Sequence, residues 1–409
     1  MTRPKLLQIN TALNWSATGK IAEQIIVLAK SLGWDCYTAH GARYVYGKSA
    51  AQDISTDFKL NDYWDAANTM FWGEHGLGSK RVTKNLIRAI DKVNPDIIHL
   101  HNVHGYYLNY QILFDYLARS RAKVVWTLHD CWAMTGHCTH FDEIGCEKWK
   151  TQCHDCPLLH TNYKSWFFDR SPSNYKLKKK CFTSVQNLTV VTVSNWLKSM
   201  VEDSFLKKYP VCVIRNGIDL NVFKPTQSEI RNRLGIGKNE KVLLGVASAW
   251  NKAKGLDEFC KLSKLFRYRV VLVGVSDSVK KHLPADMITI KRTVNQEELA
   301  AYYTMADVFV NPTHSDSFPT VNLEALACGT PVVTYRTGGS PEAIDENTGM
   351  AVEKGDFQAL KSAIEVILQK GKDSYSEFCR KRAEQHFNKD ERFADYIRLY
   401  EKILSSKSK

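Results

Sequence analysis

The stretch from residue 308 to residue 344 carries acidic residues and glycine-rich turns at a spacing that could bind an anion. A polar loop with Asp316 follows an apolar run, and a helix is expected from Thr320 to a glycine cap at Gly329. Free backbone N–H groups and the helix dipole attract negative charge at such a helix start, so a diphosphate would fit there. Glu324 lies in the first turns of this helix, where its carboxylate could accept hydrogen bonds from both hydroxyls of a ribose.

Each of these features also has a plainer interpretation. Taken separately, the glycines could be ordinary turn residues and Glu324 could be an exposed residue of a surface helix. The next strand, however, closes with a second glycine-rich turn, TGGSPEAI, in which Ser340 and Pro341 are expected as the N-cap and first residue of a further helix. Together the features favour a site for a nucleotide and its phosphates.

A second stretch with chemical potential runs from Thr127 to Pro157 and is rich in cysteine and histidine. Thiols stay reduced in the cytosol, where we expect the protein, so we expect no disulfide framework. Four cysteines could hold a tetrahedral structural zinc ion, namely Cys138, Cys146, Cys153 and Cys156. The CHDC pair has the two-residue gap of zinc sites, whereas the first pair is spaced more loosely. Packing thiols or a redox-labile pair are the alternatives.

These residues must be positioned by regular elements, and the chain alternates short apolar runs with helical patterns, as parallel βα units do. The first run, KLLQIN, is followed by the loop TALNWSATGK and by a helix whose apolar residues share one face and which ends at Gly33. Further strands are expected at DCYTAH, DIIHLHN, KVVWTLHD, LTVVTVS and VCVIRNG. Each run is apolar enough to be buried on both faces, which indicates an open α/β sheet.

The length of 409 residues is too great for one ordinary core, and the βα pattern starts again after NGIDLNVFKP. New strands are expected at KVLLGVASAW, YRVVLVGVS, MITIKRTV, DVFVNPT and PVVTYRT. We predict two Rossmann-like α/β domains: residues 1–222, with a cysteine-rich insert at 131–157, and residues 223–387. A C-terminal helix in 388–409 should pack back on the first domain. Ligand sites at the carboxyl ends of the strands would face each other across a deep cleft.

The net charge is +13 and the positive charge is unevenly distributed. From Lys164 to Lys208 there are nine Lys or Arg residues against three acids, whereas residues 301–350 have one Arg and six acids. Either a solvated surface or a contact with anionic lipid would explain this basic stretch. The N-terminal apolar run is too short for a signal peptide, and no run of about 18 apolar residues occurs. We therefore expect a cytoplasmic protein, with a peripheral contact at the inner face of the cell membrane as a further hypothesis.

The motifs resemble those of glycosyltransferase family 4 over nearly the whole chain. Asp316, seven intervening residues and Glu324 are followed by EALACGTPVV and a TGGSPE loop. VSNWL, IRNGIDLNVFKP, KGLDEF and ELAAYYTMADVFVNP also match family motifs in order. The resemblance implies the GT-B fold and transfer of a sugar from a nucleotide-sugar, such as a UDP- or GDP-sugar, with retention of anomeric configuration. The stretch HDCWAMTGHC with its later cysteines resembles bacterial members that build capsular, colanic-acid or O-antigen polysaccharide, which implies a glycan or polyprenyl-diphosphate-linked acceptor.

The resemblance also assigns roles in the second domain. Lys254 corresponds to a lysine on the donor diphosphate and Glu324 to a ribose-binding glutamate. Asp316 stands where the family usually has Glu near the transferred sugar, and its side chain is one methylene shorter. The family commonly has an Arg at the position of Ala249, and Lys252 could take over that diphosphate contact. The other donor-binding residues that we expect are Arg292, Thr293, Ser317, Phe318, Pro319 and Thr320.

In the first domain, Gly19 corresponds to a glycine that lets the backbone approach the donor or acceptor closely, although an ordinary flexible loop is the alternative. His129 ends a strand and resembles a histidine that contacts the transferred sugar, with Asp130 able to orient it; a buried, satisfied histidine is the alternative. Together with Lys254 and Asp316, His129 is expected to be catalytic. In the family's same-face mechanism the leaving phosphate helps to deprotonate the acceptor hydroxyl, so we expect no catalytic metal or other cofactor.

Two other functions fit parts of the sequence. A zinc-containing nucleic-acid binder would explain the charge and the cysteines, but residues 138–157 have two lysines against four acids, so we expect no nucleic-acid partner. A sugar-nucleotide epimerase on the same fold would carry further acids and histidines for proton transfer and would lack EALACGTPVV. The sequence therefore favours a glycosyltransferase.

Overall fold

The computed structural model describes residues 3–56, 59–161, 163–265 and 268–406. The chain forms two compact units: unit 1 comprises Met1–Ile214 and Phe393–Lys409, and unit 2 comprises Arg215–Arg392. The sequence placed these divisions at 222/223 and 387/388. The connecting segments belong to unit 2 because they contact each other: Ile218 and Asn388 form a parallel bridge, and the Lys389 ammonium pairs with Asp219.

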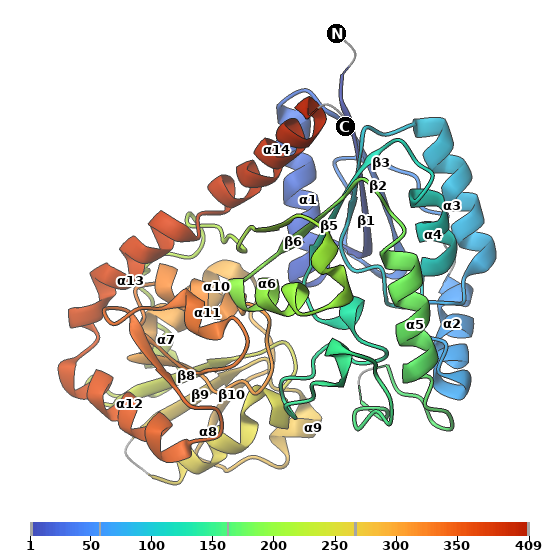
Figure 1. Ribbon diagram of the computed structural model, residues 1–409. Helices are drawn as coiled ribbons and strands as arrows, with labels where there is room; N and C mark the ends of the chain where they lie inside the picture. The colour runs from blue at the N-terminus through green and yellow to red at the C-terminus, as the bar shows by residue number, and fades with distance from the viewer. Residues whose placement is uncertain (1–2, 57–58, 162, 266–267, 407–409) are drawn as a thin grey trace. The chain divides into compact units, whose positions relative to one another are not determined.

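Unit 1 is built on a seven-stranded parallel sheet with the strand order β3-β2-β1-β4-β5-β6-β7 (Figure 1). Its strands are β1 (Lys5–Leu13), β2 (Asp35–Val45), β3 (Gln52–Asp53), β4 (Ile97–Leu100), β5 (Lys123–Leu128), β6 (Leu188–Thr192) and β7 (Val211–Val213). All but β3 coincide with apolar runs in the sequence. β4 is buried along its whole length and β5 at every position after Lys123, because helices cover both faces of the sheet.

The helices of unit 1 form two layers. On one face lie α1 (Ser16–Ser31) and the part of α14 (Lys389–Ser405) that begins at Phe393 (Figure 1). The opposite face is covered by α3 (Lys80–Val93), α4 (Tyr110–Leu117) and α5 (Ser171–Phe182). The remaining helices are α2 (Lys59–Trp72) and α6 (Asn195–Glu202). The cysteine-rich insert has only short 3₁₀ turns, at Trp132–Met134 and Lys148–Lys150.

The C-terminal helix packs on the first unit. Phe393, Tyr396 and Tyr400 are buried in one hydrophobic cluster with residues of α1 and of strands β1, β4 and β5. The Tyr400 hydroxyl and His99 Nδ1 are 2.6 Å apart. A segment that follows all of unit 2 in the sequence therefore completes the core of unit 1.

The first βα connection differs from the predicted loop. β1 continues beyond residue 10, with a register irregularity between Asn10 and Ala12, because β2 is also long and pairs with this extension. The helix already begins at Ser16, so Gly19 lies in the first turn of α1 rather than in a loop. A β-carbon at Gly19 would lie 3.1 Å from the Asn14 nitrogen, so the glycine permits a tight strand–helix turn.

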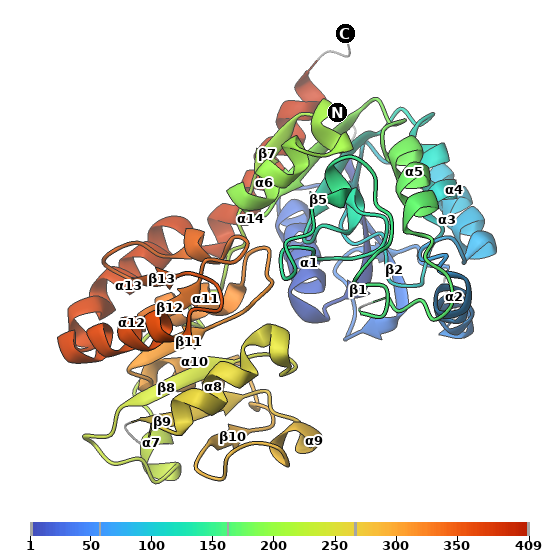
Figure 2. The same cartoon turned by 60° about the horizontal axis from the view of Figure 1, so that its bottom comes forward.

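Unit 2 contains a six-stranded parallel sheet with the strand order β10-β9-β8-β11-β12-β13 (Figure 2). Its strands are β8 (Val242–Val246), β9 (Arg269–Val273), β10 (Ile288–Ile290), β11 (Val308–Asn311), β12 (Val332–Tyr335) and β13 (Gly349–Val352), of which β13 was not predicted. Its helices are α7 (Ile230–Arg233), α8 (Leu256–Ser263), α9 (Asp277–Lys280), α10 (Gln296–Met305), α11 (Thr320–Ala327), α12 (Phe357–Lys370) and α13 (Asp373–His386).

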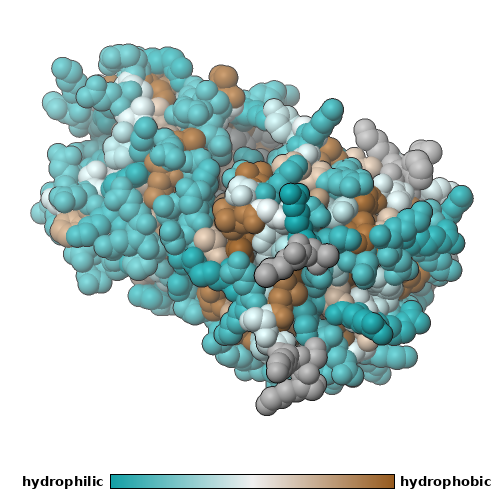
Figure 3. Space-filling view, turned by 90° about the horizontal axis from the view of Figure 1, so that it is seen from above, coloured by the Kyte–Doolittle hydropathy of each residue, from teal (hydrophilic) through white to brown (hydrophobic). Residues whose placement is uncertain are grey.

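The surface shown in Figure 3 is mostly hydrophilic, and its hydrophobic residues form separate groups. Among the described residues, no helix combines the length and the apolar character that crossing a bilayer would require.

Candidate active site

In unit 2, the predicted donor residues gather at the carboxyl ends of neighbouring strands. β8 and β11 are adjacent in the sheet, so the loops that follow them meet. Lys254 lies in the loop after β8, and Asp316 lies in the loop after β11. The Lys254 Nζ atom is 2.8 Å from Asp316 Oδ2, and both side chains are partly exposed. The structure therefore joins two predicted catalytic residues, 62 positions apart, in one ion pair.

The backbone holds these two loops together. The N–H of His314 donates to the carbonyl of Ala253 at 2.8 Å, and the Thr313 hydroxyl donates to the same oxygen. Gly255 has a φ of +76°, and a β-carbon there would lie 2.4 Å from the ring of Pro312. Because only glycine fits this conformation and this close contact, the turn that presents Lys254 has a fixed shape.

The start of α11 offers several hydrogen-bond donors. The helix begins at Thr320, and the two residues before it, Phe318 and the N-cap Pro319, are buried. Three buried hydroxyls in this region lack a hydrogen-bond partner within the described part of the chain, namely Ser317 Oγ, Thr337 Oγ1 and Ser340 Oγ. Unpartnered buried donors beside a helix N-terminus are suited to bind phosphate oxygens.

The glycine-rich turn after β12 packs directly on this helix start. Gly338 has a φ of +53°, and a β-carbon there would lie 1.7 Å from the carbonyl oxygen of Asp316. The short helix that follows spans Ser340–Ala343, and its N-cap is Gly339. The predicted N-cap role of Ser340 was therefore wrong by one position, because Ser340 already has helical geometry and its hydroxyl makes no cap bond.

Glu324 lies one turn into α11, and a buried tyrosine holds its carboxylate. The hydroxyl of Tyr303, from α10, donates to Glu324 Oε2 at 2.8 Å. Burial raises the pKa of Tyr303 well above its usual value, and the nearby Glu324 carboxylate adds to this effect. Tyr303 therefore stays a neutral donor at every physiological pH.

The other predicted donor residues lie at the same edge of the sheet. Lys252 is exposed in the loop after β8, and among the described residues no carboxylate pairs with it. Arg292 and Thr293 follow β10, which is separated from β8 by β9 alone. Two strand spacings, about 10 Å, therefore separate the positions where these loops leave the sheet.

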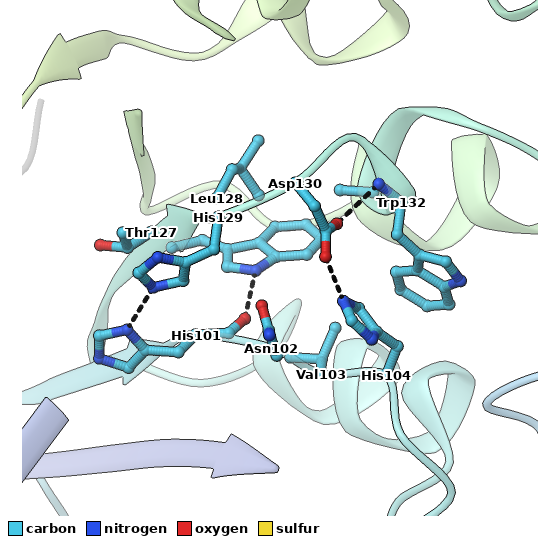
Figure 4. Close-up of a pocket in the computed structure, with 11 residues that line it drawn as sticks. His101, Asn102, Val103, His104, Thr127, Leu128, His129, Asp130 and Trp132 are labelled. Atoms are coloured by element: carbon cyan, nitrogen blue, oxygen red, sulfur yellow. Dashed lines mark hydrogen bonds and ion pairs between the residues drawn. The ribbon is translucent and has the colours of Figure 1, made fainter. Parts of the chain in front are cut away.

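In unit 1, His129 lines a pocket at the ends of β4 and β5 (Figure 4). Its Nε2 atom is 3.0 Å from His101 Nδ1, and His101 Nε2 is 2.7 Å from Gln8 Oε1. Gln8 Oε1 accepts a hydrogen bond from the N–H at His101 Nε2, so His101 Nδ1 is an acceptor and His129 Nε2 a donor. Three adjacent strands thus set the orientation and the tautomer of His129.

Asp130 does not orient His129, contrary to the sequence-based expectation. Its Oδ2 atom is 3.0 Å from His104 Nε2, and its Oδ1 atom accepts the backbone N–H of Trp132 (Figure 4). His104 Nδ1 in turn lies 2.6 Å from the Tyr163 hydroxyl. Burial alone would raise the pKa of Asp130, but His104 and these hydrogen bonds lower it to about 2.

Three buried histidines at the ends of β4 and β5, His99, His101 and His129, are neutral at pH 7 because of their burial. Burial lowers the pKa of His129 to about 4, and it lowers the pKa values of His99 and His101 well below the usual range. In the unfolded chain these side chains take up protons near pH 6.5. Their contribution to stability is therefore present above pH 6.5 and is lost as the pH falls toward 4.

We expect acid to destabilise unit 1 in this pH window. His129 alone should contribute at most about 3 kcal/mol to the loss, because one pKa unit corresponds to about 1.4 kcal/mol. Thermal unfolding between pH 7 and pH 4.5, compared for the wild type and His129→Gln, would measure the effect. Equal pH slopes for the two proteins would contradict it.

Two models of known protein families match adjoining parts of the chain. Residues 61–222 match the model of Glycosyltransferase Family 4, and residues 226–386 match the model of Glycosyl transferases group 1. The chain belongs to glycosyltransferase family 4.

One relative of this family 4 glycosyltransferase is the "Putative colanic acid biosynthesis glycosyl transferase WcaC" of Escherichia coli (strain K12). The two are 26% identical over 344 residues, which cover 78% of this chain and 79% of the relative. Among solved structures, sucrose-phosphate synthase from Thermosynechococcus elongatus superposes with a TM-score of 0.77 at 18% identity, covering 99% of this chain and 100% of that chain. Anabaena Alr3699/HepE in complex with UDP gives a TM-score of 0.65 at 15% identity, covering 97% and 100%. These likenesses show that the family 4 glycosyltransferase has the GT-B fold.

The cysteines of this glycosyltransferase are all free thiols. Cys138, Cys146, Cys153 and Cys156 line one cavity, and the N–H of Gly136 donates to Cys153 Sγ at 3.2 Å. Burial raises the pKa of Cys153 to about 11. Over the described ranges, no three or more His, Cys, Asp or Glu side chains are arranged to hold a metal ion. Zinc binding stays a prediction that metal analysis of the purified protein would test.

Sequence reasoning about this glycosyltransferase missed the partners that hold the site residues. Gln8, His101, His104, Tyr163 and Tyr303 were not singled out. For two of them a signal existed, because HLHNVH places polar residues directly after β4, next to the strand that carries His129. For Tyr303, which is one of many aromatic residues on apolar helix faces, the sequence carries no such signal.

Proposed function

We propose that this protein transfers a sugar from a UDP- or GDP-sugar to a glycan or a lipid-linked oligosaccharide during synthesis of a bacterial surface polysaccharide, with retention of anomeric configuration. The observation that carries the proposal is the Lys254–Asp316 pair, 2.8 Å apart, directly before the start of α11. The similarity to a protein of colanic acid biosynthesis supports the polysaccharide part of the proposal.

The arrangement suits a diphosphate leaving group. As the bond between the sugar carbon and the phosphate oxygen breaks, negative charge grows on that oxygen. The Lys254 ammonium, the N–H groups at the start of α11 and the buried Ser317 hydroxyl would stabilise this charge more strongly in the transition state than in the ground state. In this proposal the diphosphate takes the place of Asp316 as the partner of Lys254, and Asp316 becomes available to the sugar hydroxyls.

Retention follows if the acceptor attacks from the side that the phosphate leaves. The acceptor hydroxyl forms the new bond to the sugar carbon, and its proton passes to the departing phosphate oxygen. The step needs no separate protein base, since the leaving phosphate supplies one. His129, neutral and held by His101, is proposed to bind a hydroxyl of the transferred sugar.

Glu324 is proposed to bind the ribose, with Tyr303 fixing the orientation of its carboxylate. Purified protein incubated with a series of UDP- and GDP-sugars should hydrolyse one of them slowly, and NMR of the released sugar should show the anomer of the donor first. Glu324→Ala should weaken nucleotide binding by about tenfold or more, because two hydrogen bonds to the ribose are lost. Glu377→Ala is a matched control, since Glu377 is exposed on α13 of the same unit and lies outside the proposed nucleotide site. Inverted product, or equal nucleotide affinity in the wild type and Glu324→Ala, would overturn the proposal.

A further inference from the structure

Helix α2 of unit 1 exposes the side that a soluble helix would normally bury. Its large aromatic residues are 44% to 74% exposed, namely Tyr63, Trp64, Phe71 and Trp72. The interior positions of the same helix hold Asp65 and Thr69, which are 1% and 0% exposed. Trp64 and Phe71 are seven positions apart and therefore share one face.

The buried polar residues keep α2 in this orientation. Asp65 Oδ1 accepts the N–H of Gly78 at 3.1 Å, and Asp65 Oδ2 accepts the Ser79 hydroxyl at 2.6 Å. The Thr69 hydroxyl donates to the Asp65 carbonyl at 2.9 Å. Rotating the helix to bury its aromatic residues would remove a carboxylate from its partners, so the exposure is built into the fold.

A second segment adds three aromatic residues to the same place. Trp166, Phe167 and Phe168 are 48%, 66% and 47% exposed. The rings of Phe71 and Trp166 have centroids 5.3 Å apart, and Trp72 stacks on Phe168 at 5.8 Å. The seven residues of α2 and this loop are called the aromatic surface below.

The loop is docked firmly on the end of α2, beside which it lies in Figure 2. The N–H of Trp166 donates to the carbonyl of Met70 at 2.8 Å. Ser165 is buried, and its hydroxyl donates to the carbonyl of Phe168 at 2.7 Å. Asn174 reaches back to the Gly73 carbonyl at 2.9 Å. The aromatic surface is therefore preformed.

The positive charge next to the aromatic surface indicates that its partner is anionic. Lys164 is exposed in the same loop, and α5, which begins at Ser171, carries exposed Lys176, Lys179 and Lys180. Lys178 of the same run is buried and donates to the carbonyls of Trp132 and Thr135, so it does not contribute to this surface. Clustered exposed aromatic rings beside several lysines match the interface of an anionic bilayer, where rings lie at headgroup depth and lysines meet phosphate.

We propose that the aromatic surface inserts into the headgroup region of an anionic membrane, with the lysines of α5 resting on lipid phosphates. The proposal goes beyond sugar transfer, because vesicle binding requires neither donor nor acceptor. It also changes the membrane contact that was predicted from the basic residues of 164–208. In this proposal the aromatic rings anchor the protein, and the basic charge sets the lipid preference.

The test is co-sedimentation of the full-length protein with vesicles of phosphatidylcholine alone or with about 30% phosphatidylglycerol, a fraction that gives the surface a clear negative potential. Trp64→Ser combined with Phe167→Ser should lower partitioning into the anionic vesicles by about tenfold or more. The matched control is Val294→Ser combined with Phe378→Ser, which removes two exposed apolar residues of unit 2 and should bind like the wild type. Hydrogen exchange of the wild type should slow at residues 59–72 and 163–170 when anionic vesicles are added, a readout that needs no variant.

Three results would overturn the proposal. The first is equal partitioning of the wild type and Trp64→Ser/Phe167→Ser into the anionic vesicles. The second is a wild type that binds neither kind of vesicle and whose hydrogen exchange at residues 59–72 and 163–170 does not change when vesicles are added. The third is a wild type that dimerises without vesicles through these residues, since a second copy would then cover the aromatic surface. Donor hydrolysis without vesicles should be the same for the wild type and Trp64→Ser/Phe167→Ser, which separates this proposal from that of sugar transfer.

Discussion

Replacing Lys254 by alanine should lower the rate of sugar transfer by about 10²- to 10³-fold, the range observed when one donor to a developing anion is removed. The loss should appear mainly in kcat, because the ammonium acts most strongly on charge that forms during bond breaking. Steady-state kinetics with saturating acceptor would measure it. Lys254→Arg should recover part of the rate, since it restores a positive charge with a different shape.

Lys280→Ala provides the control for charge, because this lysine is exposed on α9 in the same unit. It should leave kcat and KM unchanged. If Lys254→Ala retained the wild-type kcat, the leaving-group role would be wrong, and the 2.8 Å pair with Asp316 would have to be structural.

Replacing Gly338 by alanine should destabilise unit 2 by about 3 kcal/mol or more, from a left-handed backbone and an atomic overlap together. A methyl group at this position would lie 1.7 Å from the Asp316 carbonyl oxygen. To make room, the turn after β12 must move away from the start of α11. Nucleotide binding should then fall even where the variant remains folded, because Ser317, Thr337 and Ser340 no longer converge.

Gly355→Ala separates the effect of the left-handed backbone from the effect of the atomic overlap. Gly355 has a similar φ of +83°, but no atom of the described ranges lies within 4 Å of the position of its missing β-carbon. Its substitution should cost only about 1 kcal/mol for the backbone conformation. Denaturant unfolding and calorimetric titration with UDP and GDP on both variants would test the difference, and equal losses of stability would contradict the role given to the close contact.

The sheets could be predicted because parallel strands that are buried on both faces read as continuous apolar runs. β13 has an exposed residue, Met350, within four residues, and β3 has two exposed residues, so neither gave that signal. The division between the units depends on contacts such as Ile218 with Asn388, which lie far apart in the sequence, and no shift in composition marks it.

The donor residues around α11 could be predicted because a helix start is a local feature of the sequence. The contacts of Asp130 could not be predicted from the sequence. Asp130 lies in the bend that follows β5, and it contacts His104, which lies in the loop after the adjacent strand β4. The relay from Gln8 through His101 to His129 depends in the same way on the order β1-β4-β5.

The return of α14 to unit 1 has a consequence for the order of events during synthesis. When residues 1–214 have left the ribosome, the pocket for Tyr396 and Tyr400 is still empty, and apolar side chains of α1 and β1 face water. Unit 2, whose residues are contiguous, can fold first although it is translated second. We therefore expect a nascent chain in which unit 2 is already folded while unit 1 still lacks the helix that covers the α1 side of its sheet.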